Sequence, residues 1–113
     1  MKLPHAAESL VERAKVEGYL LNAAHPFGAS KARFFARFGF RREAWEILAA
    51  ALHEHGCSNP VVRFRETIFG TRYEVEGALI APDGRQPRIV SVWQVDRGEF
   101  APRLITAYPM EQP

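Results

Sequence analysis

The chain of 113 residues contains one cysteine and no long run of apolar residues. Cys57 alone cannot form a disulfide within the chain, and no Cys or His partners stand near it at the spacing of a structural zinc site. Charged residues interrupt the apolar stretches every few positions, so none approaches the roughly 20 apolar residues that cross a bilayer. The N-terminus lacks the apolar core of a secretory signal. We therefore expect a cytoplasmic protein that contacts no membrane.

The motifs of the common nucleotide-binding and hydrolytic sites are also missing. The sequence has no GxxxxGK phosphate loop, no GxGxxG turn, no HExxH, no GxSxG and no paired CxxC. We expect neither a cofactor nor a metal. The net charge is only +2, but 12 of the 15 basic residues are arginine, whose planar fork suits phosphate and carboxylate. This favours an anionic partner, although a thermophilic or GC-rich origin would also raise the arginine content.

The hydrophobic pattern predicts helices in the first half of the chain and strands in the second. Apolar residues recur at spacings of three and four over residues 12–22, 31–38 and 42–55, with Ser30 as an N-cap and Gly39 and Gly56 as helix ends. From Pro60 the period changes to two, which predicts strands over residues 62–68, 72–79, 88–95 and 103–108. Residues 9–11 could form a short extended piece before the helices.

Three short connections between the four strands imply a meander of antiparallel neighbours. The sheet must bury its apolar face, and the helices are the material available to cover it. We predict an α+β fold, a single domain over residues 1–113, with about three N-terminal helices packed on one face of a four-stranded antiparallel sheet.

The segment 25–31 is the first candidate site. It combines His25, a glycine turn at Gly28, the free amides of a helix N-terminus and Lys31, which are the parts of an anion site. Alternatively, His25 shapes the loop and Lys31 keeps its amine in water. His53 and His55 are two apart on a helix and point to different sides, so they are interpreted as a solvated helix end.

The arginines of the strands are the second candidate. Arg63 and Arg65 share one strand face, and Arg72 could lie across the hairpin, which gives a basic stripe suited to nucleic acid. Arg88 could add charge further along the sheet. A solvated sheet surface, partly neutralised by neighbouring glutamates, is the alternative.

The last strand supplies the remaining candidates. Alternation predicts Arg103 and Ile105 on one face and Leu104, Thr106 and Tyr108 on the other. Thr106 and Tyr108 could place hydroxyls at the end of the strand, near the charge of Arg103. Tyr108 could equally seal the rim of the core.

Many of these residues follow one known pattern over nearly the whole chain. They are Leu3-Pro4, Tyr19-Leu20-Leu21-Asn22, His25-Pro26 with Gly28, Lys31-Ala32 with Phe34-Phe35, Gly39-Phe40, Trp45 with Leu48, Gly70, Glu76-Gly77, Pro82-Asp83-Gly84, Val92-Trp93 and residues 102–109. The chain thereby resembles a bacterial family of small domains of unknown function. Members stand beside another small gene or end larger polymorphic toxins. The element order is similar to the barnase, EndoU, colicin and RelE superfamily of metal-independent ribonucleases.

The resemblance favours a toxin-like ribonuclease of a toxin–antitoxin or polymorphic toxin system. Metal-independent attack of the 2′-hydroxyl on phosphate needs a proton acceptor, a proton donor and positive charge. We expect His25 as acid or base, Lys31 and Arg103 as cations, and Thr106 and Tyr108 as hydroxyl donors.

Two other functions fit the same sequence. The first is a module that binds nucleic acid or another anion without turnover. The second is a protein-interaction domain, such as an immunity or antitoxin partner, that uses a sheet edge or the Phe-rich second helix. The expected partners are thus RNA and a cognate antitoxin or immunity protein, and pairing of a sheet edge could also give a dimer.

Overall fold

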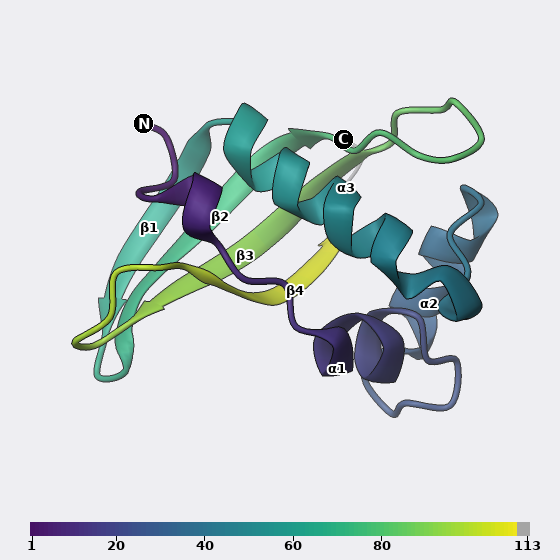
Figure 1. Ribbon diagram of the computed structural model, residues 1–113, viewed down its shortest axis with the longest axis horizontal. Helices are drawn as coiled ribbons and strands as arrows, with labels where there is room; N and C mark the ends of the chain where they lie inside the picture. The colour runs from purple at the N-terminus through teal and green to yellow at the C-terminus, as the bar shows by residue number, and fades with distance from the viewer. Residues whose placement is uncertain (111–113) are drawn as a thin grey trace.

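The computed structural model describes residues 1–110 and has two layers, a four-stranded antiparallel sheet and a set of helices on one of its faces (Figure 1). The strands lie in chain order, so the sheet is the predicted meander. This arrangement confirms the α+β fold. None of the helices in residues 1–110 is long and apolar enough to cross a membrane. The strands are β1 (Val61–Thr67), β2 (Gly70–Ala78), β3 (Arg88–Asp96) and β4 (Arg103–Pro109).

The first helical segment changes its winding part-way. It begins as α1 (Arg13–Lys15) and continues as a π-helical turn over Val16–Leu20. Val16 and Leu20 are buried in the core. The sequence predicted a helix here but not the π turn, a rare geometry that often occurs at functional sites.

The expected extended piece before this helix is reduced to one pairing. Leu10 forms an isolated parallel bridge with Arg103: its amide donates to the Pro102 carbonyl at 2.8 Å, and the Leu104 amide donates to the Leu10 carbonyl at 2.9 Å. The N-terminal segment is therefore tied to the start of β4.

The second helix, α2 (Ala29–Arg37), begins directly after Gly28 and has no side-chain cap. The prediction of Ser30 as N-cap is therefore wrong, because the turn in front of the helix is closed by other hydrogen bonds. Phe35 is completely buried, and Phe34 contacts it with ring centroids 5.2 Å apart. Gly39 has a φ of 95°, which ends the helix as expected.

The third helix, α3 (Trp45–Ser58), follows a 3-10 turn at Arg42–Ala44 and crosses the sheet (Figure 1). Gly56 lies inside it, so the prediction that Gly56 ends the helix is wrong. A Cβ at Gly56 would lie 2.8 Å from Cζ2 of Trp93. This glycine therefore lets α3 approach β3. The helix ends before Asn59, whose extended conformation is imposed by the following proline.

A chain of buried hydrogen bonds joins α3 to the sheet. Trp93 Nε1 donates to Ser91 Oγ at 2.8 Å, the Ser91 hydroxyl pairs with His55 Nδ1 at 2.8 Å, and His55 Nε2 donates to the Gly77 carbonyl at 3.1 Å. His53 also has a partner, Ser9 Oγ, at 3.0 Å from Nδ1. The interpretation of both histidines as a solvated helix end is wrong, because the helix continues past them and packs its last turns on the sheet.

Candidate functional site

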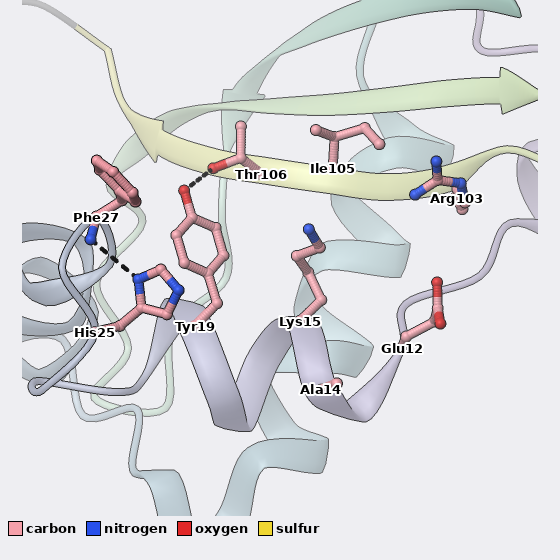
Figure 2. A pocket seen from close by; sticks show the side chains of 9 residues that line it. All are labelled: Glu12, Ala14, Lys15, Tyr19, His25, Phe27, Arg103, Ile105 and Thr106. Atoms are coloured by element: carbon pink, nitrogen blue, oxygen red, sulfur yellow. Dashed lines mark hydrogen bonds between the residues drawn. The ribbon is translucent and has the colours of Figure 1, made fainter. Parts of the chain in front are cut away.

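A hollow of about 660 Å³ lies between β4 and the first helical segment. Figure 2 shows that its side chains come from three parts of the chain: the helical segment, the turn that follows it, and β4. A volume of this order suits a small ligand or a nucleotide unit. We call this hollow the cleft; its lining residues are Glu12, Ala14, Lys15, Tyr19, His25, Phe27, Arg103, Ile105 and Thr106.

Tyr19 is the central side chain of the cleft. Its hydroxyl hydrogen bonds Thr106 Oγ1 at 3.0 Å, and its ring lies edge-on to His25 with centroids 5.0 Å apart (Figure 2). The ammonium groups of Lys15 and Lys31 lie 5.4 and 5.6 Å from the centre of the same ring. Both distances allow cation–π attraction. One aromatic ring thus gathers two cations, an imidazole and a hydroxyl.

The turn between the helices fixes His25. Its Nδ1 accepts hydrogen bonds from the amides of Phe27 at 3.0 Å and Gly28 at 3.1 Å. In the neutral ring the hydrogen therefore sits on Nε2, which is the nitrogen left to act as a donor. Gly28 is required here, because a Cβ would overlap the Tyr19 carbonyl oxygen. The amides of Phe27 and Gly28 at the start of the helix therefore donate to His25 and are not free to bind an anion.

Arg103 is oriented by Asp96. Its Nε donates to Asp96 Oδ2 at 2.6 Å and its Nη2 to Asp96 Oδ1 at 3.2 Å. The hydrogen bond from Arg103 lowers the pKa of the Asp96 carboxyl, and the same contact raises the pKa of Arg103. This bidentate pair holds the guanidinium at the end of the cleft, with its charge partly compensated.

A β-bulge sets which side chains of β4 reach the cleft. Thr106 pairs with Val92 but Leu104 pairs with Trp93, so Ile105 is an extra residue between them. The simple alternation predicted for this strand is therefore wrong. Leu104 enters the core, whereas Arg103 and Thr106, predicted on opposite faces, both line the cleft.

The structure brings together three of the five predicted catalytic residues. His25, Arg103 and Thr106 line the cleft, and Lys31 reaches its edge, where Nζ donates to the Phe27 carbonyl at 3.4 Å. Tyr108 lies outside it, in a separate depression with Glu74. Burial raises the pKa of the Tyr108 phenol, and the nearby Glu74 charge adds to this effect.

The four arginines predicted to bind nucleic acid lie along the sheet and not in the cleft. Arg63 is paired with Glu74 at 3.7 Å, and Arg65 lies opposite Arg72 in the β1–β2 register. Arg88 starts β3, opposite Ala78. Arg63, Arg65 and Arg72 are therefore neighbours in the β1–β2 register, with Arg63 partly neutralised by Glu74.

The sequence interpretation missed three lining residues that carry chemistry: Glu12, Lys15 and Tyr19. Lys15 and Tyr19 are four apart on one helical segment, a spacing that places both on one face. That spacing was an available signal, but the strand they face could not be read from it. Within residues 1–110, no three His, Cys, Asp or Glu side chains come together as a metal site.

The comparisons with known proteins give a family and a fold. A family model described as "Domain of unknown function (DUF6883)" matches residues 2–111. The chain belongs to this family. No curated protein sequence matches this DUF6883 domain. Among solved structures, it is similar to a chain of a contact-dependent growth inhibition toxin–immunity protein complex from Klebsiella pneumoniae 342. The TM-score is 0.73 at 21% identity, over 96% of this chain and 98% of that chain, which establishes a shared fold.

Proposed function

We propose that this DUF6883 domain is a toxin-like ribonuclease that acts in the cytoplasm and cleaves RNA without a metal. The observation that carries the proposal is the cleft, which is lined by cations, hydroxyls, an imidazole and a carboxylate from distant parts of the chain (Figure 2). The fold is also that of a chain in a toxin–immunity protein complex, which supports a place in such a system.

The proposed reaction is an internal transfer at phosphorus. The 2′-oxygen of RNA attacks the adjacent phosphorus, the bond from phosphorus to the 5′-oxygen breaks, and the products are a 2′,3′-cyclic phosphate and a 5′-hydroxyl. Glu12 accepts the proton of the 2′-hydroxyl, since it is the carboxylate among the lining residues. Lys15, three residues after Glu12, gives a proton to the leaving 5′-oxygen. A water molecule then carries the proton from Glu12 to Lys15, which restores both groups.

The other groups of the cleft hold the phosphate. His25 donates from Nε2 to a non-bridging oxygen, because its Nδ1 is occupied by two amides. Thr106 and Tyr19 share one hydrogen bond, so the pair has one hydroxyl hydrogen left to donate to the phosphate. Arg103 adds positive charge as negative charge develops there. This role for His25 is narrower than the acid or base role expected from the sequence.

The test is cleavage of RNA by purified protein in the presence of EDTA, with detection of the cyclic phosphate. Thr106→Val, Lys15→Ala and His25→Asn are the informative variants. Asn keeps an oxygen that can accept the amides of Phe27 and Gly28 but lacks the Nε2 donor. Loss of an acid or base should lower the rate at least about 100-fold, so we expect that fall for Lys15→Ala.

Arg41→Gln is the matched control, because Arg41 is exposed and bonds only to the neighbouring Glu43 among the described side chains. Its rate should equal that of the wild type. Expression in cells should be toxic for the wild type and harmless for Lys15→Ala, and co-expression of the neighbouring gene should suppress toxicity. RNA left intact at high protein excess, with harmless expression, would refute the proposal.

The alternative of a protein-interaction domain is favoured by a different feature, the exposed edge strand β1. Val62 and Phe64 leave 50% and 56% of their surfaces exposed there. An edge strand with apolar side chains can pair with a strand of another protein. Co-purification with the product of the neighbouring gene, without any RNA affinity, would favour this alternative.

A further inference from the structure

The ends of the two hairpins enclose a second hollow that adjoins the cleft. It measures about 520 Å³ and lies where the β1–β2 turn meets the β3–β4 loop. Arg103 lines both hollows, so one guanidinium stands at their junction. The second hollow also contains Arg72 and Arg97, and its rim carries Phe69.

The second hollow carries more positive charge than its acidic partner neutralises. Three arginines line it, against the single carboxylate of Asp96, which is already bound by Arg103. Arg72 Nη2 donates to Gln94 Oε1 at 2.9 Å, while its Nε is buried without a hydrogen-bond partner among the described residues. The guanidinium groups of Arg72 and Arg97 can bind phosphate oxygens through charge-assisted hydrogen bonds, so the excess positive charge of the hollow suits a phosphate.

The side chain of Phe69 lies beside these arginines. Phe69 leaves 65% of its surface exposed at the tip of the β1–β2 hairpin. The tip is held in place, because the Arg97 amide donates to the Phe69 carbonyl at 2.9 Å. Gly70, with a φ of 139°, packs so closely on Val95 that a Cβ would overlap the Val95 carbonyl oxygen. Aromatic rings beside positive charge are the platforms on which the bases of single-stranded nucleic acid stack.

We propose that this second hollow binds a further nucleotide, beside the two that the scissile phosphate joins, with its base on Phe69 and its phosphate between Arg72 and Arg97. The inference rests on the proposed function for the choice of RNA as ligand. It makes the substrate a single strand of several nucleotides that passes across Arg103 from one hollow to the other.

The test measures binding of a fluorescent single-stranded RNA whose 2′-hydroxyls are methylated, so that it cannot be cleaved. Phe69→Ala should weaken binding at least about fivefold, the loss typical of one stacked base. Arg97→Gln should reduce the slope of log K against log salt by about 0.7, the loss of one phosphate contact to a single strand. Both residues are exposed, so unfolding midpoints should not change.

Ile80→Ala and Arg41→Gln are the matched controls. Ile80 is 62% exposed in the connection between β2 and β3, Arg41 is exposed before α3, and neither lines the second hollow. Their affinities should equal that of the wild type. Equal affinity of Phe69→Ala and Arg97→Gln with the wild type would overturn the inference, as would a wild type that does not bind the RNA.

Turnover distinguishes this inference from the proposed function. If the cleft cleaves RNA, Phe69→Ala should cleave a dinucleotide at the wild-type rate and lose the higher rate on longer RNA. If no RNA is cleaved by the wild type, the proposed function fails, and the binding measurement still decides whether the second hollow holds a nucleotide.

Discussion

The ring of His55 is engaged at both nitrogens inside the interface between α3 and β3. Nδ1 accepts from Ser91 and Nε2 donates to the Gly77 carbonyl, and only 2% of the residue is exposed. A second ring hydrogen would place a charge where water does not reach. Burial accordingly lowers the pKa of His55 below its usual value.

The stability of the domain should therefore depend on pH through His55. Since its pKa is lower in the folded state, the unfolded chain binds the proton first, and stability is lost as the pH falls below about 6.5, the pKa of a free histidine. Above that pH the contribution is fully present. Urea unfolding of the wild type from pH 8 to 5.5 should show this decline, and His55→Gln should show a smaller one. An unchanged slope in the variant would contradict the assignment.

At the scale of the elements, glycines decide how closely helices approach their neighbours. Gly56 lies against the ring of Trp93, with no room for a Cβ, whereas nothing lies within 4 Å of the Cβ position at Gly18. Both glycines are in helical segments. The same substitution should therefore have opposite effects at the two positions.

We expect Gly18→Ala to stabilise the domain by about 0.5–1 kcal/mol, because alanine restricts the unfolded chain and favours a helix. Gly56→Ala should destabilise it by about 1–3 kcal/mol, because the added methyl forces Trp93 or the helix to shift. Denaturant midpoints of the two variants measure both free energies. A stabilising Gly56→Ala would show that α3 does not pack on Trp93 as described.

The elements themselves were largely predictable, and their irregular parts were not. The strands follow from the alternation after Pro60, and α3 follows from apolar spacing, because both patterns are local. The bulge at Ile105, the π turn before Leu21 and the placement of Gly56 depend on how layers meet. Those features arise from packing between segments far apart in the chain, which local periodicity does not encode.

At the scale of the molecule, the ion pair of Arg103 and Asp96 lies where the two hollows meet. His25 and Thr106 were candidate site residues in the sequence, and the structure places both in the cleft, but Tyr19, which contacts both, was not a candidate. Asp96 was also missed, although it holds Arg103 at the junction of the two hollows. Its carboxylate competes with any phosphate for that guanidinium.

Asp96→Asn should therefore tighten RNA binding and steepen its salt dependence, by about 0.7 in the log–log slope for each additional phosphate that the protein neutralises. Asp83→Asn is the matched control. It removes the same charge from a pair with Arg85 in the β2–β3 loop and should leave both quantities close to wild-type values. Fluorescence anisotropy over a salt series measures both. An equal increase in affinity for the two variants would mean that net charge alone governs binding.

The cleft joins residues near the start of the chain to residues near its end, and Leu10 is already paired with Arg103. Contacts of such long sequence separation carry a high loop-closure cost and tend to form late in folding. Until β4 has paired with β3, Tyr19 has no Thr106 to bond, and the cleft lacks its third wall. The helices and the first three strands can thus pack together before β4 pairs with β3. The pairing of β4 is then the folding step that completes the cleft.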